Sequence, residues 1–289
     1  MQVIGFIFFR LLLGIFYVIP FPILYKISDG VAWLLRVVVK YRLKVVKSNL
    51  EKAFPEKNAT EIETIIKGSY QNLADIFLES LKGMTLNWDK PLDRYRFLNP
   101  EIIEPYSKKN IPTLHNATHC GNWEWATYSY TMFFKERTVA FYKPLSNRLI
   151  DKFVLKKRSS KRVILVDIKN TPNHFKNNLA NGNDVAFVLL SDQSPTSKNS
   201  TWVNFLGIET AFLRGAQFYA LKYSLPVFYL RIRRVKRGWY ELSLELITEN
   251  ANNETENFVT KRYAELLERD IRKAPSDWLW THKRWKLSR

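Results

Sequence analysis

The chain has 289 residues, of which 46% are hydrophobic and 15% aromatic, a composition that excludes an intrinsically disordered protein and predicts a sizeable core. Its 45 lysines and arginines outnumber 27 aspartates and glutamates and give a net charge of +18. We therefore expect an anionic partner: nucleic acid, phospholipid headgroups, a phosphorylated lipid or an acidic carrier protein. The single cysteine, Cys120, excludes an intramolecular disulfide framework.

The N-terminal segment, residues 1–48, is predicted to attach the protein to a membrane. Residues 3–25 are almost wholly apolar and come close to the ~20 residues of a membrane-spanning helix. Arg10, Pro20 and Pro22 interrupt them, so a spanning helix and a helix lying in the membrane interface both stay open. No basic residue precedes the apolar stretch, and we expect the segment to be retained rather than cleaved as a signal peptide.

A basic series follows a second apolar run at residues 31–39. It consists of Arg36, Lys40, Arg42, Lys44 and Lys47. Such a series binds anionic headgroups and marks the cytoplasmic side of a membrane, whereas a solvated helix face is the alternative interpretation. Beside an apolar segment, we favour a membrane surface as the partner.

Residues 49–289 are predicted to form a single α/β catalytic domain. An amphipathic helix is expected after Asn58, and from residue 111 the pattern alternates between strands and helices. Strands are expected at 111–118, 137–143, 162–168, 184–190, 226–234 and 239–248, and helices at 123–134, 146–157, 171–181, 211–224 and 256–273. This alternation predicts a mixed, largely parallel sheet flanked by helices, with the last two strands forming an antiparallel hairpin.

The stretch from His119 to Glu124, His-Cys-Gly-Asn-Trp-Glu, carries the strongest chemical signal. Asn122 is a plausible N-cap for the helix that follows the Gly-Asn turn, which puts His119 at the carboxyl end of a strand. Glu124, one turn into the helix, can reach back to the imidazole. A carboxylate on one ring nitrogen fixes the tautomer and makes the other nitrogen a general base, so we expect His119 to take a proton from a hydroxyl with Glu124 as its partner.

Covalent catalysis is not expected. The sequence contains no Gly-x-Ser-x-Gly motif, and Cys120 points away from His119 on an extended chain, so we interpret it as a small buried filler. Direct transfer from donor to acceptor is the favoured route. No cluster of residues indicates a metal or an organic cofactor.

The motif resembles the His-x-x-x-x-Asp/Glu signature of the lysophospholipid acyltransferase superfamily and, within it, the late acyltransferases of lipid A biosynthesis. Further blocks resemble that family in the same order, so the similarity spans nearly the whole chain. They are Asn49-Leu50, Ala53-Phe54-Pro55-Glu56, Phe141-Tyr142-Lys143-Pro144 with Asn147, Asp192-Gln193, Phe205-Leu206-Gly207 and Trp280-Thr281-His282-Lys283-Arg284. The resemblance implies a glycerol-3-phosphate acyltransferase-like fold. Lys143 departs from the Tyr-Arg-Pro block, because an ammonium group replaces a guanidinium group there.

What the resemblance implies is transfer of a fatty acyl chain from a thioester, on acyl carrier protein or coenzyme A, to a hydroxyl of a lipid A precursor, a phosphorylated glycolipid. Glu124 would orient His119, and backbone N–H groups or a cation would hold the oxyanion. The candidate cations are Lys143, Arg158 and Arg214, of which we rank Arg158 first. The substrate-binding residues that we expect are Asn122, Trp123, Lys143, Asn147, Arg158, Asp192, Gln193 and Arg214.

The resemblance also implies a location at the cytoplasmic face of a bacterial inner membrane. Other acceptors stay open, among them a lysophospholipid, an aminolipid or a glycosylated phosphoinositide, and so does release of the acyl chain to water. A nucleic-acid partner is not expected, because the aromatic residues lie within apolar strands instead of alternating with basic residues on one exposed face. The tryptophan-rich tail, residues 278–285, fits either a membrane-interface belt or a packed lid.

Overall fold

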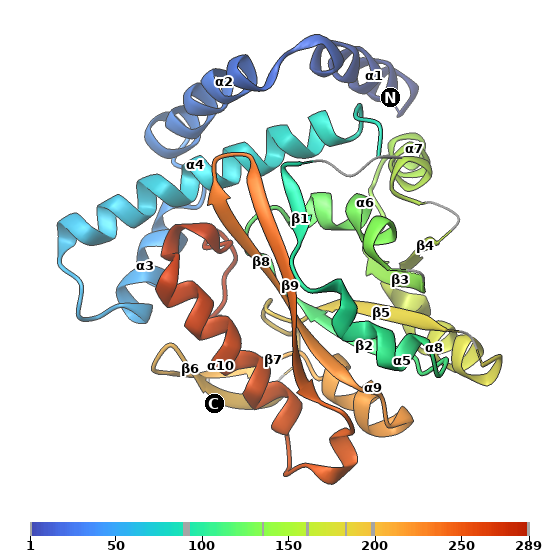
Figure 1. Ribbon diagram of the computed structural model, residues 1–289. Helices are drawn as coiled ribbons and strands as arrows, with labels where there is room; N and C mark the ends of the chain where they lie inside the picture. The colour runs from blue at the N-terminus through green and yellow to red at the C-terminus, as the bar shows by residue number, and fades with distance from the viewer. Residues whose placement is uncertain are drawn as a thin grey trace.

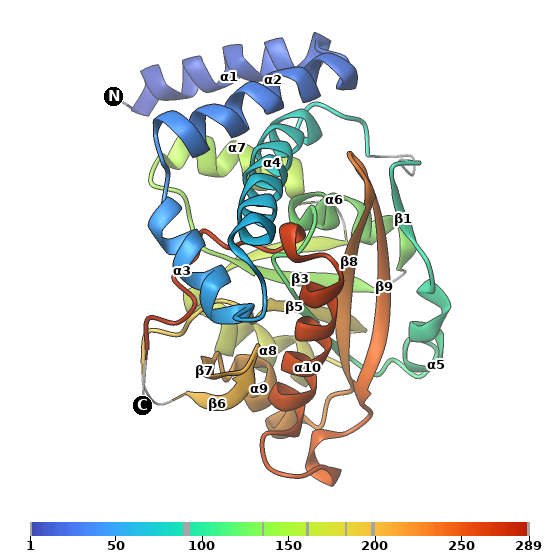
Figure 2. The same ribbon diagram turned by 90° about the vertical axis from the view of Figure 1, so that its left-hand side faces the viewer.

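The structure is a computed structural model that describes residues 2–88, 93–134, 136–159, 162–182, 184–197 and 200–287. A seven-stranded sheet runs through its middle, and helices cover both faces of this sheet (Figures 1 and 2). The predicted mixed α/β fold with a largely parallel sheet is therefore confirmed.

The helices are α1 (Gln2–Val18), α2 (Phe21–Trp33), α3 (Leu43–Ala53), α4 (Ala59–Gly83), α5 (Glu104–Ser107), α6 (Trp123–Phe133), α7 (Arg148–Arg158), α8 (Thr171–Ala180), α9 (Gly215–Tyr223) and α10 (Phe258–Lys273). A π-helical turn, Leu34–Val38, extends α2, and short 3₁₀ helices lie at Pro100–Ile103, Ile168–Asn170, Ala251–Asn253 and Pro275–Asp277. The strands are β1 (Tyr95–Phe97), β2 (Thr113–Ala117), β3 (Arg137–Tyr142), β4 (Val163–Asp167), β5 (Val185–Leu190), β6 (Thr201–Phe205), β7 (Ile208–Phe212), β8 (Val227–Lys236) and β9 (Trp239–Thr248).

The strand order in the large sheet is β1-β9-β8-β2-β5-β3-β4. Strands β8, β2, β5, β3 and β4 run parallel to one another, while β9 pairs antiparallel with β8, as the predicted hairpin required. Strand β2 therefore lies inside the sheet between β5 and β8. The carboxyl ends of β2 and β5 meet at the same edge, which is where open α/β sheets bind ligands.

The sheet is buried on both faces, as a largely parallel sheet must be. Neighbouring residues of one strand point to opposite faces, and Phe187 and Val188 of β5 accordingly belong to two different clusters of buried apolar side chains. Phe228 and Tyr229 of β8 divide in the same way. Burial on both faces fixes the register of these central strands, because a shift by one residue would exchange the two sets of side chains.

Three strands differ from the sequence prediction. Strand β1 at the sheet edge is only three residues long and falls outside the predicted alternation. Strands β6 and β7 form a separate antiparallel pair joined by Leu206 and Gly207, which both have positive φ angles. The helix expected over residues 211–224 therefore begins only at Gly215, because residues 211 and 212 pair with β6.

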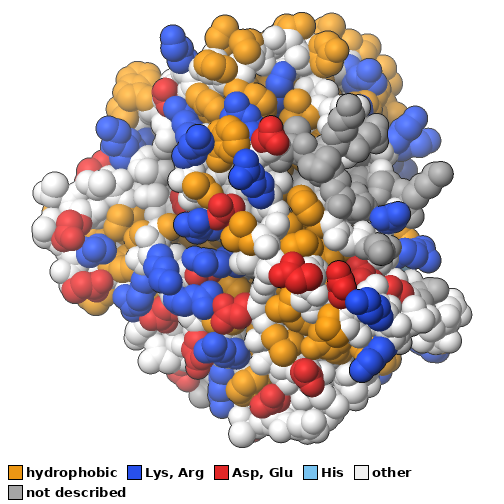
Figure 3. All heavy atoms as spheres, in the orientation of Figure 1, with side chains coloured by type: hydrophobic (Ala, Val, Ile, Leu, Met, Phe, Trp, Pro, Cys, Tyr) orange, Lys and Arg blue, Asp and Glu red, His pale blue; other side chains and the backbone are white. Residues whose placement is uncertain are grey.

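The N-terminal helices lie along the outside of the molecule. Helix α1 packs on α7 through the rings of Phe9 and Phe153, and α2 packs on α4. The two helices are separated at Pro20, the N-cap position of α2. Apolar side chains gather over them in Figure 3. Phe8 and Leu11 of α1 are exposed to solvent. Among the described residues, no helix combines the length and the apolar character that crossing a membrane requires.

Candidate active site

The sheet register brings His119 next to a carboxylate that is distant in sequence. Ala117, the last residue of β2, pairs with Leu190, the last residue of β5. Two residues further along each chain segment come His119 and Asp192, so the parallel register places them side by side at the carboxyl edge of the sheet.

Asp192 binds His119 through both of its oxygens. Its Oδ1 lies 2.6 Å from His119 Nδ1, and its Oδ2 accepts a hydrogen bond of 2.8 Å from the His119 backbone N–H. The indole N–H of Trp278 donates to the same Oδ2 at 2.8 Å. Burial alone would raise the pKa of Asp192, but the interaction with His119 and these hydrogen bonds outweigh it and lower the pKa to about 2.

This contact determines which imidazole nitrogen is available for chemistry. An ionised carboxylate only accepts hydrogen bonds, so the proton of a neutral His119 ring lies on Nδ1 and the lone pair on Nε2. Gln193 Nε2 lies 3.2 Å from His119 Nε2, a position from which its amide donates to that lone pair. The rings of His119 and Trp123 also pack edge to face, with 5.1 Å between ring centroids. His119 is therefore oriented as a base by residues from two segments, the loop after β5 and the start of α6.

The turn that carries His119 has little freedom. Gly121 has a φ of +55°, and a Cβ at this position would lie 3.0 Å from Ile232 Cγ2, so a larger residue would be both strained and crowded. Asn122 Oδ1 accepts the backbone N–H of Trp125 at 2.9 Å, which confirms Asn122 as the N-cap of α6. The Gly121 N–H donates to the carbonyl of Asp277, so the C-terminal segment closes over the turn.

Glu124 has a different partner from the one the sequence predicted. Its carboxylate forms an ion pair with Arg158 at the end of α7, while the carboxylate on His119 is that of Asp192. The expected contact between Glu124 and His119 is corrected in this way. The cause is tertiary: α7 brings a cation beside the first turn of α6, and strand pairing brings Asp192 to the imidazole. Glu124 and His119 nevertheless line the same cavity.

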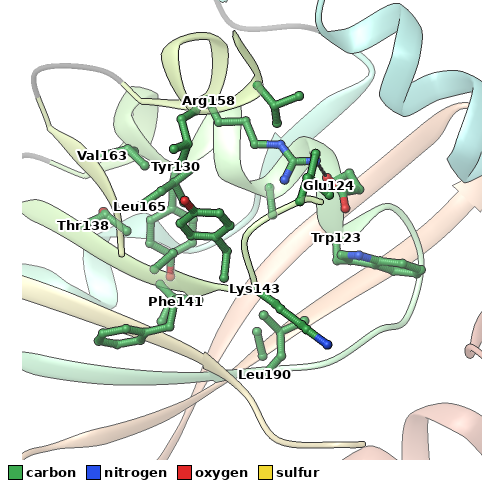
Figure 4. A pocket seen from close by; sticks show the side chains of 18 of the residues that line it. Trp123, Glu124, Tyr130, Thr138, Phe141, Lys143, Arg158, Val163, Leu165 and Leu190 are labelled. Carbon is green, nitrogen blue, oxygen red and sulfur yellow. Dashed lines mark hydrogen bonds and ion pairs between the residues drawn. The ribbon is translucent and has the colours of Figure 1, made fainter. Parts of the chain in front are cut away.

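The cavity beside His119 has a volume of about 450 Å³. Figure 4 shows Trp123, Glu124 and Arg158 on one side of it and Thr138, Val163 and Leu165 on the other. Most of the other lining side chains are apolar: Phe9, Met84, Ala117, Ala126, Ala140, Phe141, Leu145, Ile150, Val154, Leu155, Val188, Leu190, Leu230 and Ile232. The arrangement combines a base and an ion pair with an apolar chamber, which suits a ligand with a reactive polar end and a hydrocarbon chain.

The structure brings together some of the predicted substrate-binding residues and not others. Lys143 lines the cavity with Trp123 and Arg158, and Gln193 lies at the imidazole. Asn147 caps α7 by accepting the N–H groups of residues 149 and 150, and it donates to the Gln2 carbonyl of α1. Arg214 is exposed at the N-cap position of α9, outside the described lining of the cavity. Asn122 is fully buried.

The C-terminal tryptophans belong to the packed interior. Trp278 is 4% exposed and Trp280 is 1% exposed, so the membrane-belt interpretation is wrong for these two residues. Sequence reasoning did not assign Trp278 a role at Asp192. It predicted that Asp192 contacts the substrate and did not predict its contact with His119, because only the strand order shows that β2 and β5 are neighbours.

Comparison with known proteins identifies the family. A family model described as bacterial lipid A biosynthesis acyltransferase matches residues 2–287. The chain belongs to this family. It is therefore an acyltransferase of lipid A biosynthesis, in agreement with the resemblance seen in the sequence.

Individual relatives of the family are distant in sequence but similar in length. The chain is 23% identical to the lipid A biosynthesis palmitoleoyltransferase of Escherichia coli strain K12, over 93% of this chain and 86% of the relative. It is also 23% identical to the lauroyltransferase of that strain, over 93% and 87% of the two chains. The lipid A biosynthesis acyltransferase of Haemophilus influenzae is 22% identical, over 93% and 86%. The relatives therefore match this chain over almost its whole length.

Proposed function

We propose that the protein transfers a fatty acyl chain from an acyl carrier protein thioester to a hydroxyl of a lipid A precursor at the cytoplasmic face of a bacterial inner membrane. The observation that carries this proposal is the His119–Asp192 pair, which lies on a largely apolar cavity of about 450 Å³. Family membership supports the acceptor class, and the net charge of +18 supports two anionic substrates.

In the proposed reaction, the acceptor hydroxyl replaces the Gln193 amide at His119 Nε2, which removes the hydroxyl proton while the hydroxyl oxygen attacks the thioester carbonyl. Asp192 holds the Nδ1–H and stabilises the imidazolium that forms. Collapse of the tetrahedral intermediate expels the carrier thiolate, which needs little protonation because the pKa of a thiol is about 8.5. The ester then carries the acyl chain, and the proton on His119 returns to the thiolate or to solvent.

The Glu124–Arg158 pair has a separate role in this proposal. Arg158 lines the same cavity and its side chain is 20% exposed, so its fixed cation can meet the polar end of a ligand that enters there. Glu124 holds that cation through the ion pair. We propose that Arg158 stabilises negative charge on the oxyanion or on an acceptor phosphate, a function for which preorganised guanidinium groups are well suited.

A covalent acyl-enzyme is not part of the proposal. Cys120 is 6% exposed, and burial raises the pKa of its thiol well above the usual value, with Asp192 adding to the effect. The thiolate is the nucleophilic form of cysteine, so Cys120 is poorly suited to attack the thioester donor. Direct transfer from donor to acceptor agrees with this environment.

We also propose that α1 and α2 lie in the membrane interface instead of crossing it. Phe8, Leu11 and Ile15 are spaced so that they share one face of α1, and all three are more than half exposed. Phe9, on another face, lines the cavity. Helix α1 thus connects an exposed apolar surface with the proposed acyl site, an arrangement that suits a lipid acceptor.

The test is an acyl-transfer assay with purified protein, acyl carrier protein loaded with a fatty acid, and a lipid A precursor in mixed micelles. We expect product with the wild-type chain and a loss of at least about 10³-fold in kcat for His119→Ala, since the base is removed. His174→Ala, which alters a partly exposed histidine on α8, is the matched control and should retain activity. Equal activity of the two variants would refute the role of His119.

The acceptor is tested separately by mass spectrometry of total lipids from a deletion strain. Loss of one acyl chain from lipid A supports the proposal. Loss of a chain from a phospholipid, aminolipid or glycosylated phosphoinositide, with lipid A unchanged, would overturn the acceptor but not the acyl transfer. Release of free fatty acid without any acylated lipid would identify a thioesterase instead.

A further inference from the structure

Glu79 is a buried carboxylate that lies outside the cavity lining and yet contacts the turn carrying His119. It lies near the end of α4 and is 0% exposed. Both of its oxygens accept hydrogen bonds: Oε1 from Tyr25 Oη at 2.9 Å, and Oε2 from Asn122 Nδ2 at 2.7 Å and Tyr240 Oη at 2.8 Å. Burying a carboxylate costs free energy unless hydrogen bonds satisfy its oxygens. We therefore ask what these hydrogen bonds of Glu79 hold in place.

Asn122 links Glu79 to the start of α6. Its Oδ1 caps α6 through the backbone N–H of Trp125, and its Nδ2 donates to Glu79, so each end of the side-chain amide has one defined partner. The backbone carbonyl of Asn122 accepts a further bond of 2.9 Å from Tyr95 Oη. The indole of Trp125 donates to the carbonyl of Glu79 at 2.8 Å, which gives α4 a second contact with the start of α6.

These contacts fix the chain on both sides of the reacting group. Asn122 follows His119 by three residues, and Trp123, whose ring packs on the imidazole, comes directly after Asn122. At the other end of the turn, Asp192 holds His119. The imidazole is thus oriented by Asp192, while the backbone that carries it is anchored to α4 through Glu79 and Asn122.

We propose that Glu79 is a positioning residue: by holding the side chain of Asn122 it sets the placement of His119 and Trp123 against the acyl cavity. It acts through the turn and touches no substrate. Because Tyr25 belongs to α2, the same carboxylate also ties the turn to the N-terminal helices that carry the exposed apolar surface. A shift of about 1 Å in a reacting group can cost about 10²-fold in rate, so such anchoring affects kcat directly.

Two substitutions of Glu79 separate the effect of side-chain length from the effect of charge. Glu79→Gln removes the charge but keeps the length, and its amide can donate to Tyr25 Oη while its oxygen accepts from Asn122. Glu79→Asp keeps the charge but withdraws the carboxylate by one methylene. We expect kcat within about threefold of wild type for E79Q and at least about tenfold lower for E79D, with KM changed by less than about threefold in both.

A rescue experiment tests the contact itself. Asn122→Asp retains a good N-cap but places two carboxylates against each other, so kcat should fall at least about tenfold. Combining N122D with E79Q restores a hydrogen bond in the reverse direction, because the amide introduced at position 79 can donate to the carboxylate introduced at position 122. The double variant should recover most of the lost kcat. Ser28→Ala removes a buried hydrogen bond to Asp75 in the same α2–α4 interface and serves as a stability control with unchanged kcat.

The activity readouts rest on the proposed function, so a readout without substrate is included. The proton NMR signal of the Nδ1–H that His119 shares with Asp192 should stay in place in E79Q and shift or broaden in E79D. If wild type transfers no acyl chain, the proposed function fails while this signal still tests Glu79. Wild-type kcat and an unchanged signal in E79D would overturn the inference, as would the absence of rescue in the double variant.

Discussion

The turn after β2 and the N-terminal helices differ in which side chains they bury. The turn buries polar groups, and helix α1 exposes apolar ones. Around the turn, polar groups are buried and bonded within the chain, as with Asp192 at 2% exposure, which accepts from His119 and Trp278. On α1, by contrast, Phe8 is 69% and Leu11 63% exposed. A buried, bonded group is set by the protein itself, whereas an exposed apolar face needs a partner outside the chain. The turn therefore bears on the chemistry of this acyltransferase, whereas the exposed face of α1 bears on what the protein contacts outside its own chain.

The largest expected effect lies at the turn. Asp192→Asn leaves the shape of the pair intact but allows an amide, instead of a carboxylate, to face Nδ1, so the ring loses its defined tautomer and the stabilisation of its charged form. We expect kcat to fall by about 10³-fold with little change in KM. Asp93→Asn alters an exposed aspartate and should retain activity. A kcat within about tenfold of wild type in D192N would mean that Asp192 is not the partner on which catalysis depends.

The ion pair on the cavity wall comes next. Arg158→Met should lower kcat by about 10²-fold, because a fixed cation is removed and Glu124 is left without its partner. Adding Glu124→Gln to R158M should lower kcat by a smaller factor than Glu124→Gln lowers it in the wild type, since both changes disrupt the same ion pair. Arg148→Met at the exposed start of α7 is the control. Strictly additive losses in the acyl-transfer assay would show that the two residues act independently.

The folded state should respond to acid through Asp192. Its pKa is lowered from the ordinary value of 3.8 to about 2, so its contribution to stability is fully present above about pH 4 and is lost as the pH falls toward 2. The free energy of unfolding of the wild type should therefore fall by about 1–2 kcal/mol more than that of D192N between about pH 7 and about pH 2.5. Denaturant titration followed by circular dichroism measures this difference. Parallel pH profiles would contradict it.

The smallest effect is expected at the N-terminal helices. Phe8→Ser removes one large apolar side chain from the exposed face of α1 and should weaken binding to anionic phospholipid vesicles by about tenfold, since burying a phenylalanine contributes at least about 1.5 kcal/mol. Turnover of substrates in detergent micelles should not change. Phe218→Ser, at a half-exposed phenylalanine of α9, is the matched control for vesicle sedimentation. Equal binding of both variants would exclude this face of α1 as the membrane contact.

Much of the fold could be read from local pattern. The strands ending at Ala117 and Leu190 and the hairpin of β8 and β9 follow from runs of apolar residues and the turn at Gly238. The N-cap at Asn122 follows from residue type and position. Strands β6 and β7 were not predicted from the sequence, because five-residue strands joined by Leu206 and Gly207 give a weak periodic signal. The split of the N-terminal segment at Pro20 was visible in the sequence, and its packing on α4 and α7 was not.

By itself, the sequence determined that His119 stands on a Gly-Asn turn between a strand and a helix, because caps and turns depend on neighbouring residues alone. Only the tertiary structure decided which acids meet which bases. Strand order placed Asp192 against the imidazole, the path of α7 brought Arg158 to Glu124, and α4 brought Glu79 into hydrogen-bond contact with Asn122. Hydrogen bonds and ion pairs act over a few ångströms, so the pairing of distant residues is fixed only when the sheet and its helices are assembled.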